Sequence, residues 1–174
     1  MTNFKFLFLI IIIGFISGFA GLYLSKNLSP SLNNPQTSIF FNSVSKDLNN
    51  NNVSLSKYKN KWLLVNFWAT WCAPCREEIP ELNELANTNK KIQLVGIAID
   101  EIEAVKKFLD KTPIYYDSFI SNDMSGVEIS KSLGNEKGVL PFTILINPNG
   151  KIQDAFYGKL DIESLNIHLA KIIK

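Results

Sequence analysis

Two apolar segments of strand length constrain the fold of this chain most. Residues 61–68 read Lys-Trp-Leu-Leu-Val-Asn-Phe-Trp, and residues 92–99 read Ile-Gln-Leu-Val-Gly-Ile-Ala-Ile. Nearly continuous apolar runs of this length are typical of central strands that are covered on both faces. Between them, residues 74–86 place apolar side chains on one helical face. The order strand, helix, strand predicts an α/β fold.

The C-terminal part of the chain predicts a hairpin followed by a helix. Residues 142–146 and 151–157 have strand character and flank the turn sequence Asn-Pro-Asn-Gly. Asp161 is expected to cap the last helix. Together with the central strands, this hairpin predicts an α/β sandwich with a mixed sheet.

Three further elements are expected between and before these segments. Asp100 is placed as an N-cap, with Glu103 completing a capping box, for a helix that runs to about residue 110. A shorter helix is expected at residues 126–133. An N-terminal hairpin is expected at residues 40–55.

The composition indicates a folded domain and excludes several function classes. Hydrophobic residues make up 46% of the 174 residues and charged residues 20%, which is enough apolar material to form a core. The net charge of +2 gives no indication of nucleic-acid binding. One histidine and two cysteines exclude most metal sites that need several ligands.

An apolar segment at residues 6–24 determines the expected compartment. Ser17 is its one clearly polar residue, and a helix of this length spans roughly 28 Å, about the thickness of the hydrocarbon core of a bilayer. The segment is longer than the core of a usual signal peptide, and no small-residue cleavage pattern follows it. A retained membrane anchor at residues 1–24 is therefore favoured over a cleaved signal peptide.

Residues 25–38 contain serine, asparagine and two prolines and are expected to form a linker. The alternative is an unstructured remnant that follows a cleaved signal peptide. The folded domain is then expected at residues 39–174. It would lie in an exported compartment, where disulfide bonds persist.

Both cysteines of the chain lie in the sequence Cys72-Ala73-Pro74-Cys75. Two intervening residues allow the side chains to meet within one helical turn and form a disulfide bond. Cys72 falls near the predicted helix N-terminus, where free N–H groups and the helix dipole favour a thiolate, whereas Cys75 lies one turn further in. This asymmetry predicts that Cys72 attacks a partner disulfide and that Cys75 resolves the mixed disulfide.

Two other interpretations of the cysteine pair are open. Half of a zinc site is disfavoured because the chain has no second cysteine pair and His168 is distant in the sequence. A purely structural disulfide is disfavoured because so short a loop constrains the unfolded chain little. A redox-active pair is the favoured interpretation.

Residues 67–75 read Phe-Trp-Ala-Thr-Trp-Cys-Ala-Pro-Cys and resemble the active-site signature of the thioredoxin superfamily. The nearer resemblance is to its membrane-anchored, extracytoplasmic reductase branch of the TlpA/ResA type, and it covers residues 40–174. It implies a thioredoxin-like three-layer α/β/α sandwich with a mixed central sheet, preceded by an N-terminal transmembrane helix. Residues 112–137 resemble the central insert of this branch, and they help to separate Cys75 from Pro141 by 66 residues.

Three further positions match this branch. Pro80 lies inside the predicted helix, where the family has a kink. The family places a cis-proline opposite the cysteines, which here is Pro141, so that the backbone of Leu140 would pair with a substrate peptide. Glu78 follows Cys75 by three residues on the same helix face, as the acidic residue of this branch does. The alternatives are an ordinary helix bend at Pro80 and a trans-proline that opens a strand.

Asn66 stands six residues before Cys72, at the place where thioredoxin itself has a buried aspartate. An amide cannot accept a proton, so Glu78 is the candidate acid/base for Cys75. The alternative is that Glu78 is a solvated carboxylate on the helix surface. His168 lies in the last helix, which the family keeps away from the active site, and is expected to be structural.

The resemblance implies a thiol-disulfide oxidoreductase that acts mainly as a reductant of disulfides in exported proteins, with apocytochrome c as a specific candidate. Strong oxidants often have a histidine between the cysteines, whereas Ala73 and Pro74 have no polar side chain. The substrate is expected to bind beside Trp71, Ala73, Pro74, Leu140 and Pro141.

This branch usually receives electrons from a membrane electron donor of the DsbD or CcdA type, and no cofactor is expected. A thiol oxidase of the same fold would differ only in its reduction potential and is the main alternative. A copper-handling protein would want a histidine and a wider cysteine spacing, and a peroxidase would need another cysteine motif. The expected location is the inner (cytoplasmic) membrane, with a single span and the catalytic domain facing the periplasm.

Overall fold

The computed structural model describes residues 35–121 and 124–173, and a mixed β-sheet forms their centre. Within these residues the sheet has seven strands in the order β2-β1-β5-β4-β3-β6-β7. The central strand β3 (Trp62–Trp68) pairs in parallel with β4 (Ile92–Ala98) and antiparallel with β6 (Phe142–Ile146). The predicted mixed sheet is therefore confirmed.

Antiparallel pairs form both edges of the sheet. At one edge, β7 (Ile152–Tyr157) pairs with β6. At the other edge, β1 (Val44–Lys46) and β2 (Asn52–Ser54) form a hairpin, and β5 (Asp117–Ile120) lies between β1 and β4. Since β5 lies within residues 112–137, this segment joins the N-terminal hairpin to the central strands.

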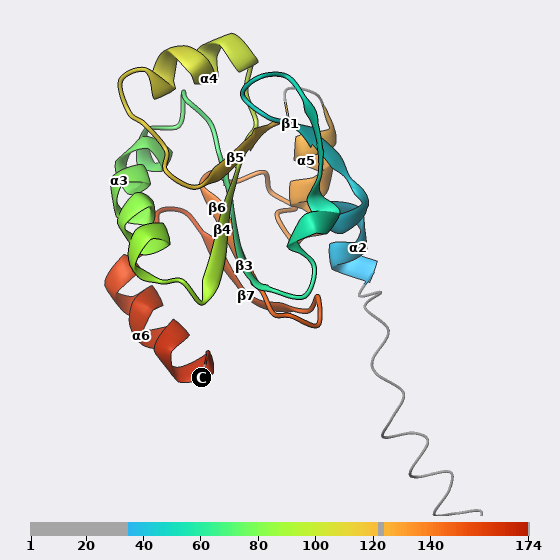
Figure 1. Cartoon of the computed structure of the whole chain (residues 1–174), viewed down its shortest axis with the longest axis vertical. Coiled ribbons are helices and arrows are strands. Elements are labelled where there is room, and N and C mark those ends of the chain that lie inside the picture. The colour runs from blue at the N-terminus through green and yellow to red at the C-terminus, as the bar shows by residue number, and fades with distance from the viewer. Residues whose placement is uncertain (1–34, 122–123, 174) are drawn as a thin grey trace, which may run out of the picture. The chain divides into compact units, whose positions relative to one another are not determined.

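Helices cover both faces of the sheet. The helices of the described residues are α2 (Pro35–Asn42), α3 (Ala73–Thr88), α4 (Ile102–Leu109), α5 (Met124–Ser132) and α6 (Ile162–Ile172), with a 3₁₀ helix at Leu55–Tyr58. Figure 1 shows α3 and α6 on one side of the sheet and α2 and α5 on the other. This arrangement is the expected three-layer α/β/α sandwich.

Alternation along the strands divides the core between the two faces of the sheet. Val65 and Phe67 of β3 pack with Phe40 of α2 on one face. Leu64, also of β3, packs with Leu82 of α3 on the other face. Because both faces are covered, the sequence of β3 is apolar throughout instead of alternating.

The hairpin predicted for residues 40–55 is wrong at its start. Phe40 and Phe41 belong to helix α2 and are buried, and the hairpin begins at Val44. So short a helix is stabilised by its packing against the sheet, which local sequence does not encode. Helix α2 also contains residues 35–38, the last four residues of the segment predicted as a linker.

The predicted anchor at residues 1–24 and most of the predicted linker lie outside the described residues. Within residues 35–121 and 124–173, no helix is both long enough and apolar enough to cross a membrane.

The capping box predicted at Asp100 is wrong. The N-cap of α4 is Glu101, whose side chain makes no capping hydrogen bond. The Asp100 carboxylate instead accepts hydrogen bonds from the backbone N and the Oγ1 of Thr70, at 2.8 and 2.5 Å. It thereby ties the loop after β3 to the end of β4. Asp161 caps α6 as predicted, because its side chain accepts from the backbone N of Ser164.

Candidate active site

The two cysteines lie where β3 ends and α3 begins. Trp68 is the last residue of β3, and Cys72 is the N-cap of α3. The side chains of Cys72 and Cys75 form a disulfide bond, and the backbone N of Cys75 donates to Cys72 Sγ at 3.3 Å. The first turn of the helix thus directs an N–H group at Cys72, which favours a thiolate there once the disulfide is reduced.

The disulfide is buried on its inner side and bordered by exposed residues on its outer side. Cys75 is fully buried, and Cys72 is 6% exposed. Trp71 is 68% exposed, and Ala73 and Pro74 are exposed as well. These three residues form the surface beside the more accessible sulfur, where the sequence predicts substrate binding.

The Leu140–Pro141 peptide bond is cis, as the resemblance implies. It lies directly before β6, the neighbour of β3 in the sheet. Leu140 packs against the apolar cluster that contains Cys72 and Cys75, and Pro141 is buried. The fold therefore brings a predicted substrate-binding position to the cysteines across 66 residues of sequence.

A buried asparagine that was not predicted from the sequence shapes the loop before the cis-proline. Asn135 is 1% exposed. Its Nδ2 donates to the backbone O of Val139 and to Ser130 Oγ, both at 2.9 Å, and its Oδ1 accepts from the backbone N of Val139 at 2.9 Å. These bonds hold Val139 immediately before Leu140. A single loop asparagine has no sequence signal that separates this role from ordinary turn formation.

Replacing Asn135 with alanine is expected to slow disulfide reduction and to lower stability. The change leaves the backbone of Val139 without its side-chain partners, so the free energy of unfolding should fall by about 1–3 kcal/mol. Denaturant unfolding and the rate of insulin disulfide reduction measure the two effects. Asn135→Asp keeps the acceptor for the Val139 N–H and should fall between wild type and alanine. A wild-type rate in Asn135→Ala would contradict the positioning role.

Glu78 is fully buried in α3, one turn beyond Cys75, so the interpretation as a solvated carboxylate is wrong. Its Oε1 accepts from Asn66 Nδ2 at 2.7 Å, and its Oε2 accepts from the backbone N of Leu160 at 3.1 Å. Burial raises the pKa of Glu78, although the hydrogen bonds from Leu160 and Asn66 and the charge of Lys159 oppose this effect. A carboxyl group with a raised pKa is suited to accept and release a proton.

Asn66 links Glu78 to the strand that follows the cis-proline. Its Nδ2 donates both to Glu78 Oε1 and to Thr143 Oγ1, the latter at 2.9 Å. All three side chains are fully buried. Asn66 was expected only to be unable to accept a proton. Its contact with Thr143 follows from the pairing of β3 with β6, and its contact with Glu78 follows from the packing of α3 on the sheet, so neither could be predicted locally.

His168 joins α6 to β7. Its Nε2 forms a hydrogen bond with Asp154 Oδ2 at 2.8 Å. The described parts of the chain, 35–121 and 124–173, contain no group of three His, Cys, Asp or Glu residues that could hold a metal ion.

A disulfide-forming cysteine pair in this position exchanges disulfides with other thiols, and the protein is a thiol-disulfide oxidoreductase with a thioredoxin-like fold. Comparison with protein families agrees with this class. The chain belongs to the AhpC/TSA family, whose model matches residues 38–155.

Individual relatives show the same class. Thiol-disulfide oxidoreductase ResA of Bacillus cereus is 31% identical over 180 residues, which cover 99% of each chain. The crystal structure of a thioredoxin-related protein from Neisseria meningitidis serogroup B matches with a TM-score of 0.66 and 32% identity, over 74% of this chain and 97% of that one. StoA from Bacillus subtilis shares the fold, with a TM-score of 0.58 and 20% identity over 72% of this chain and 93% of that one. The predicted resemblance is confirmed.

Proposed function

We propose that the protein is a membrane-anchored reductase of disulfides in exported proteins, including apocytochrome c during cytochrome c maturation. The surroundings of Cys72 carry this proposal. Its sulfur accepts a hydrogen bond from the backbone N of Cys75, and Ala73 and Pro74 add no polar side chain. The Cys72 thiolate is therefore stabilised only modestly. This favours electron donation, because a strong oxidant needs a reduced form that is much more strongly stabilised.

The apolar segment at residues 6–24 supports a single membrane anchor. The catalytic domain then faces the periplasm, where exported proteins acquire disulfides. Each catalytic cycle needs two electrons, for which we propose a membrane electron donor of the DsbD or CcdA type. The relative named thiol-disulfide oxidoreductase ResA, which is similar over 99% of both chains, supports the reaction class.

The proposed reaction begins with Cys72 as a thiolate and Cys75 as a thiol. Cys72 Sγ attacks one sulfur of the substrate disulfide, whose S–S bond breaks, and the first substrate thiolate leaves and takes up a proton. Glu78 accepts the proton of Cys75. The Cys75 thiolate then attacks Cys72 Sγ, which closes the Cys72–Cys75 disulfide and releases the second substrate thiolate. Two electrons have then passed from the protein to the substrate.

The substrate is proposed to bind over the accessible edge of the disulfide. Trp71, Ala73 and Pro74 provide exposed surface beside Cys72. On the other side, Leu140 packs against the cysteine cluster and precedes the cis peptide bond to Pro141. An extended substrate segment that pairs with the backbone of Leu140 would place its disulfide beside Cys72.

The deciding experiment is the reduction potential of the full-length protein in detergent micelles, equilibrated against glutathione or dithiothreitol buffers. A value below about −230 mV supports the reductase, because thioredoxin lies at about −270 mV. A value above about −150 mV would identify a thiol oxidase of the same fold and overturn the proposed direction. Cys75→Ser cannot form the intramolecular disulfide. It is the control that the measured potential belongs to the Cys72–Cys75 pair.

Protease treatment of spheroplasts tests the proposed location. The protein should remain in the membrane fraction, and protease added outside intact spheroplasts should digest the catalytic domain. Recovery of a shortened chain in the soluble periplasmic fraction would show a cleaved signal peptide and contradict the anchor.

A further inference from the structure

A row of side chains crosses the sheet beneath helix α3. In the strand register, Asn66 of β3 lies opposite Thr143 of β6 and Gly96 of β4, and Gly96 lies opposite Ser118 of β5. Residues opposite one another in a sheet share a face. Since Asn66 donates to Glu78 of α3, the row lies on the α3 face. It separates the apolar cluster under α6 from the cluster that contains the cysteines.

Four buried polar atoms near Gly96 have no hydrogen-bond partner among the described residues. These atoms are Asn66 Oδ1, Trp68 Nε1, Tyr116 Oη and Ser118 Oγ. A Cβ added at Gly96 would lie 3.1 Å from Tyr116 Cε2, 3.2 Å from Ser118 Oγ and 3.3 Å from Trp68 Nε1. Three of the four side chains therefore meet over the glycine, and Asn66 is its neighbour in the register. Buried polar atoms are nearly always paired, with protein or with ordered water.

The four unpaired atoms have the chemistry of a water site. Trp68 Nε1 can only donate, and Asn66 Oδ1 can only accept, whereas the hydroxyls of Tyr116 and Ser118 can do both. The Nδ2 of Asn66 already donates to Glu78 and to a side chain of β6, which leaves the amide oxygen as the free acceptor. A buried water typically makes about three hydrogen bonds to otherwise unpaired groups, which this set provides.

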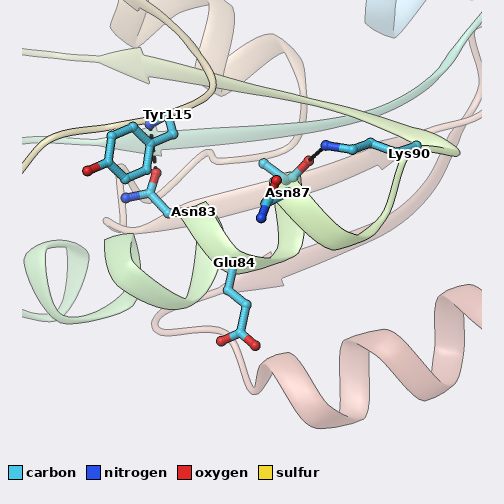
Figure 2. A pocket seen from close by; sticks show the side chains of 6 residues that line it. Asn83, Glu84, Asn87, Lys90 and Tyr115 are labelled. Atoms are coloured by element: carbon cyan, nitrogen blue, oxygen red, sulfur yellow. Dashed lines mark hydrogen bonds between the residues drawn. The ribbon is translucent and has the colours of Figure 1, made fainter.

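Tyr116 reaches this place because Asn83 of α3 holds the residues before it. Asn83 Nδ2 donates to the backbone O of Pro113, and Asn83 Oδ1 accepts from the backbone N of Tyr115, both at 2.8 Å. Figure 2 shows the Asn83 side chain pointing to the backbone of Tyr115, beside a surface pocket. Tyr115 is 76% exposed, whereas Tyr116 packs into the cluster under α3 and α6. Two consecutive residues of this segment therefore differ, because Tyr115 faces solvent and the Tyr116 hydroxyl is buried.

Glu78 needs a route for its proton because it has no exposed surface. A proton accepted from Cys75 cannot pass from the carboxylate directly to solvent. Burial raises the pKa of Tyr116, and the charge on Glu78 raises it further, so the hydroxyl is electrostatically coupled to the carboxylate. Tyr116 and Ser118, whose hydroxyls have no hydrogen-bond partner among the described residues, both lie beside Gly96.

The other charged groups near Glu78 lie towards solvent. Lys159 lowers the pKa of Glu78 and Glu81 raises it. Lys159 Nζ forms exposed ion pairs with Glu77 and Glu81, at 3.5 and 3.9 Å. On its own helix, Glu78 also follows the thiol of Cys75 by one turn in the reduced protein. The buried neighbours on the β5 side are Tyr116 and the unpaired atoms beside it.

We propose that the side chains around Gly96 form a buried water site, and that the bound water passes the proton of Glu78 to solvent by way of Ser118 and Tyr116. The proton route rests on the acid/base role of Glu78 in the proposed function, whereas the water site does not. Trp68, Ser118 and Tyr116 are positioning residues, because they act through the water. In each cycle the S–H bond of Cys75 breaks, Glu78 gains the proton, and the water releases one proton to solvent, which restores the carboxylate.

The water site is tested by NMR on the oxidised full-length protein in micelles, with ¹⁵N-labelled tryptophan. Magnetisation transfer from water to the Trp68 indole N–H should show the cross-relaxation of a long-lived bound water. The exposed Trp71 indole provides the reference for contact with bulk solvent. Gly96→Ala, whose Cβ crowds the site, should abolish the signal at Trp68. Absence of transfer to Trp68 in the wild type would overturn the site.

The proton route is tested by the rate at which Cys75 resolves a mixed disulfide between Cys72 and glutathione, followed against pH. Ser118→Ala and Tyr116→Phe each remove one hydroxyl without adding volume. Each should slow resolution about tenfold at neutral pH and displace the inflection of the pH profile. Tyr58→Phe is the matched control, because it removes a buried tyrosine hydroxyl on the opposite face of the sheet.

Glu78→Gln distinguishes failure of this inference from failure of the proposed function. If Glu78→Gln removes the inflection while Ser118→Ala and Tyr116→Phe keep the wild-type profile, the proton route is wrong and the function stands. If Glu78→Gln also keeps the wild-type profile, the acid/base role is wrong, and the proton route with it. If the pH profile of resolution changes in all three variants and stays as in the wild type in Tyr58→Phe, both the acid/base role of Glu78 and the proton route are supported.

Discussion

Replacing Cys72 with serine is expected to lower the turnover of disulfide reduction at least about a thousandfold, because a serine hydroxyl without a base is a very weak nucleophile. The helix N-terminus and the Cys75 N–H that favour a thiolate at this position cannot ionise a hydroxyl at neutral pH. The rate of insulin disulfide reduction by the full-length protein measures the loss. The free energy of unfolding of the reduced variant should match that of the reduced wild type.

The partner variant Cys75→Ser should behave differently. Cys72 can still attack, but nothing resolves the mixed disulfide, so exported substrates should remain covalently attached. Non-reducing gels and mass spectrometry of material from the membrane fraction identify them. The double variant Cys72→Ser, Cys75→Ser is the control, because it has no thiol. Trapping by Cys72→Ser instead of Cys75→Ser would reverse the assigned roles.

Replacing Glu78 with glutamine is expected to slow the resolving step at neutral pH by about ten- to a hundredfold. Glutamine has the same shape and can still accept from Asn66, but it cannot accept a proton from Cys75. In the wild type the rate should rise as Glu78 loses its proton. The inflection should lie above the ordinary glutamate pKa of 4.5, because burial raises the pKa of Glu78. Stopped-flow kinetics against pH measure both the rate and the inflection.

The same carboxyl group should make stability depend on pH. Since the pKa of Glu78 is raised in the folded state, the folded protein binds this proton more tightly than the unfolded chain does. Its stabilising contribution is full below the unfolded pKa and is lost as the pH rises through the folded pKa. A tenfold difference in proton affinity corresponds to about 1.4 kcal/mol. Denaturant unfolding of the oxidised protein should show this slope, and Glu78→Gln should lack it.

Glu84→Gln is the matched control for both measurements. Glu84 lies on the same helix but is exposed, so its neutralisation should change neither the resolving rate nor the pH slope. A Glu78→Gln variant indistinguishable from Glu84→Gln would leave Glu78 as a structural group and contradict its acid/base role.

The central strands and the cysteine pair could be predicted because their signals are local. Strands β3 and β4 are covered on both faces, so their sequences are continuous apolar runs that need no knowledge of their partners. The cysteine pair is encoded within four residues, and a helix start is recognisable from the residues that surround it. The fold class, the position of Cys72 and Cys75 and the cis bond before Pro141 were therefore accessible from the sequence and its resemblance.

The errors arose where a polar or short segment has a distant partner. Asp100 has the sequence context of a helix cap, but its carboxylate binds Thr70 at the end of the neighbouring strand. Phe40 has no recognisable periodicity around it, because helix α2 depends on the sheet face that it covers. Local propensity is a weak term, and tertiary packing decided both cases.

The strand-helix alternation, the cysteine pair and the acidic residue one turn beyond the pair can all be read from the chain before it is folded. The surroundings of that acidic residue depend on how the helix packs on the sheet. Glu78 is buried and held by Asn66 of β3, 12 residues away in the sequence, and by Leu160 of the loop before α6, 82 residues away. The relative position of Cys72 and Cys75 follows from a single helical turn. The burial and the pKa of Glu78 depend instead on side chains that come together only when the sheet has formed.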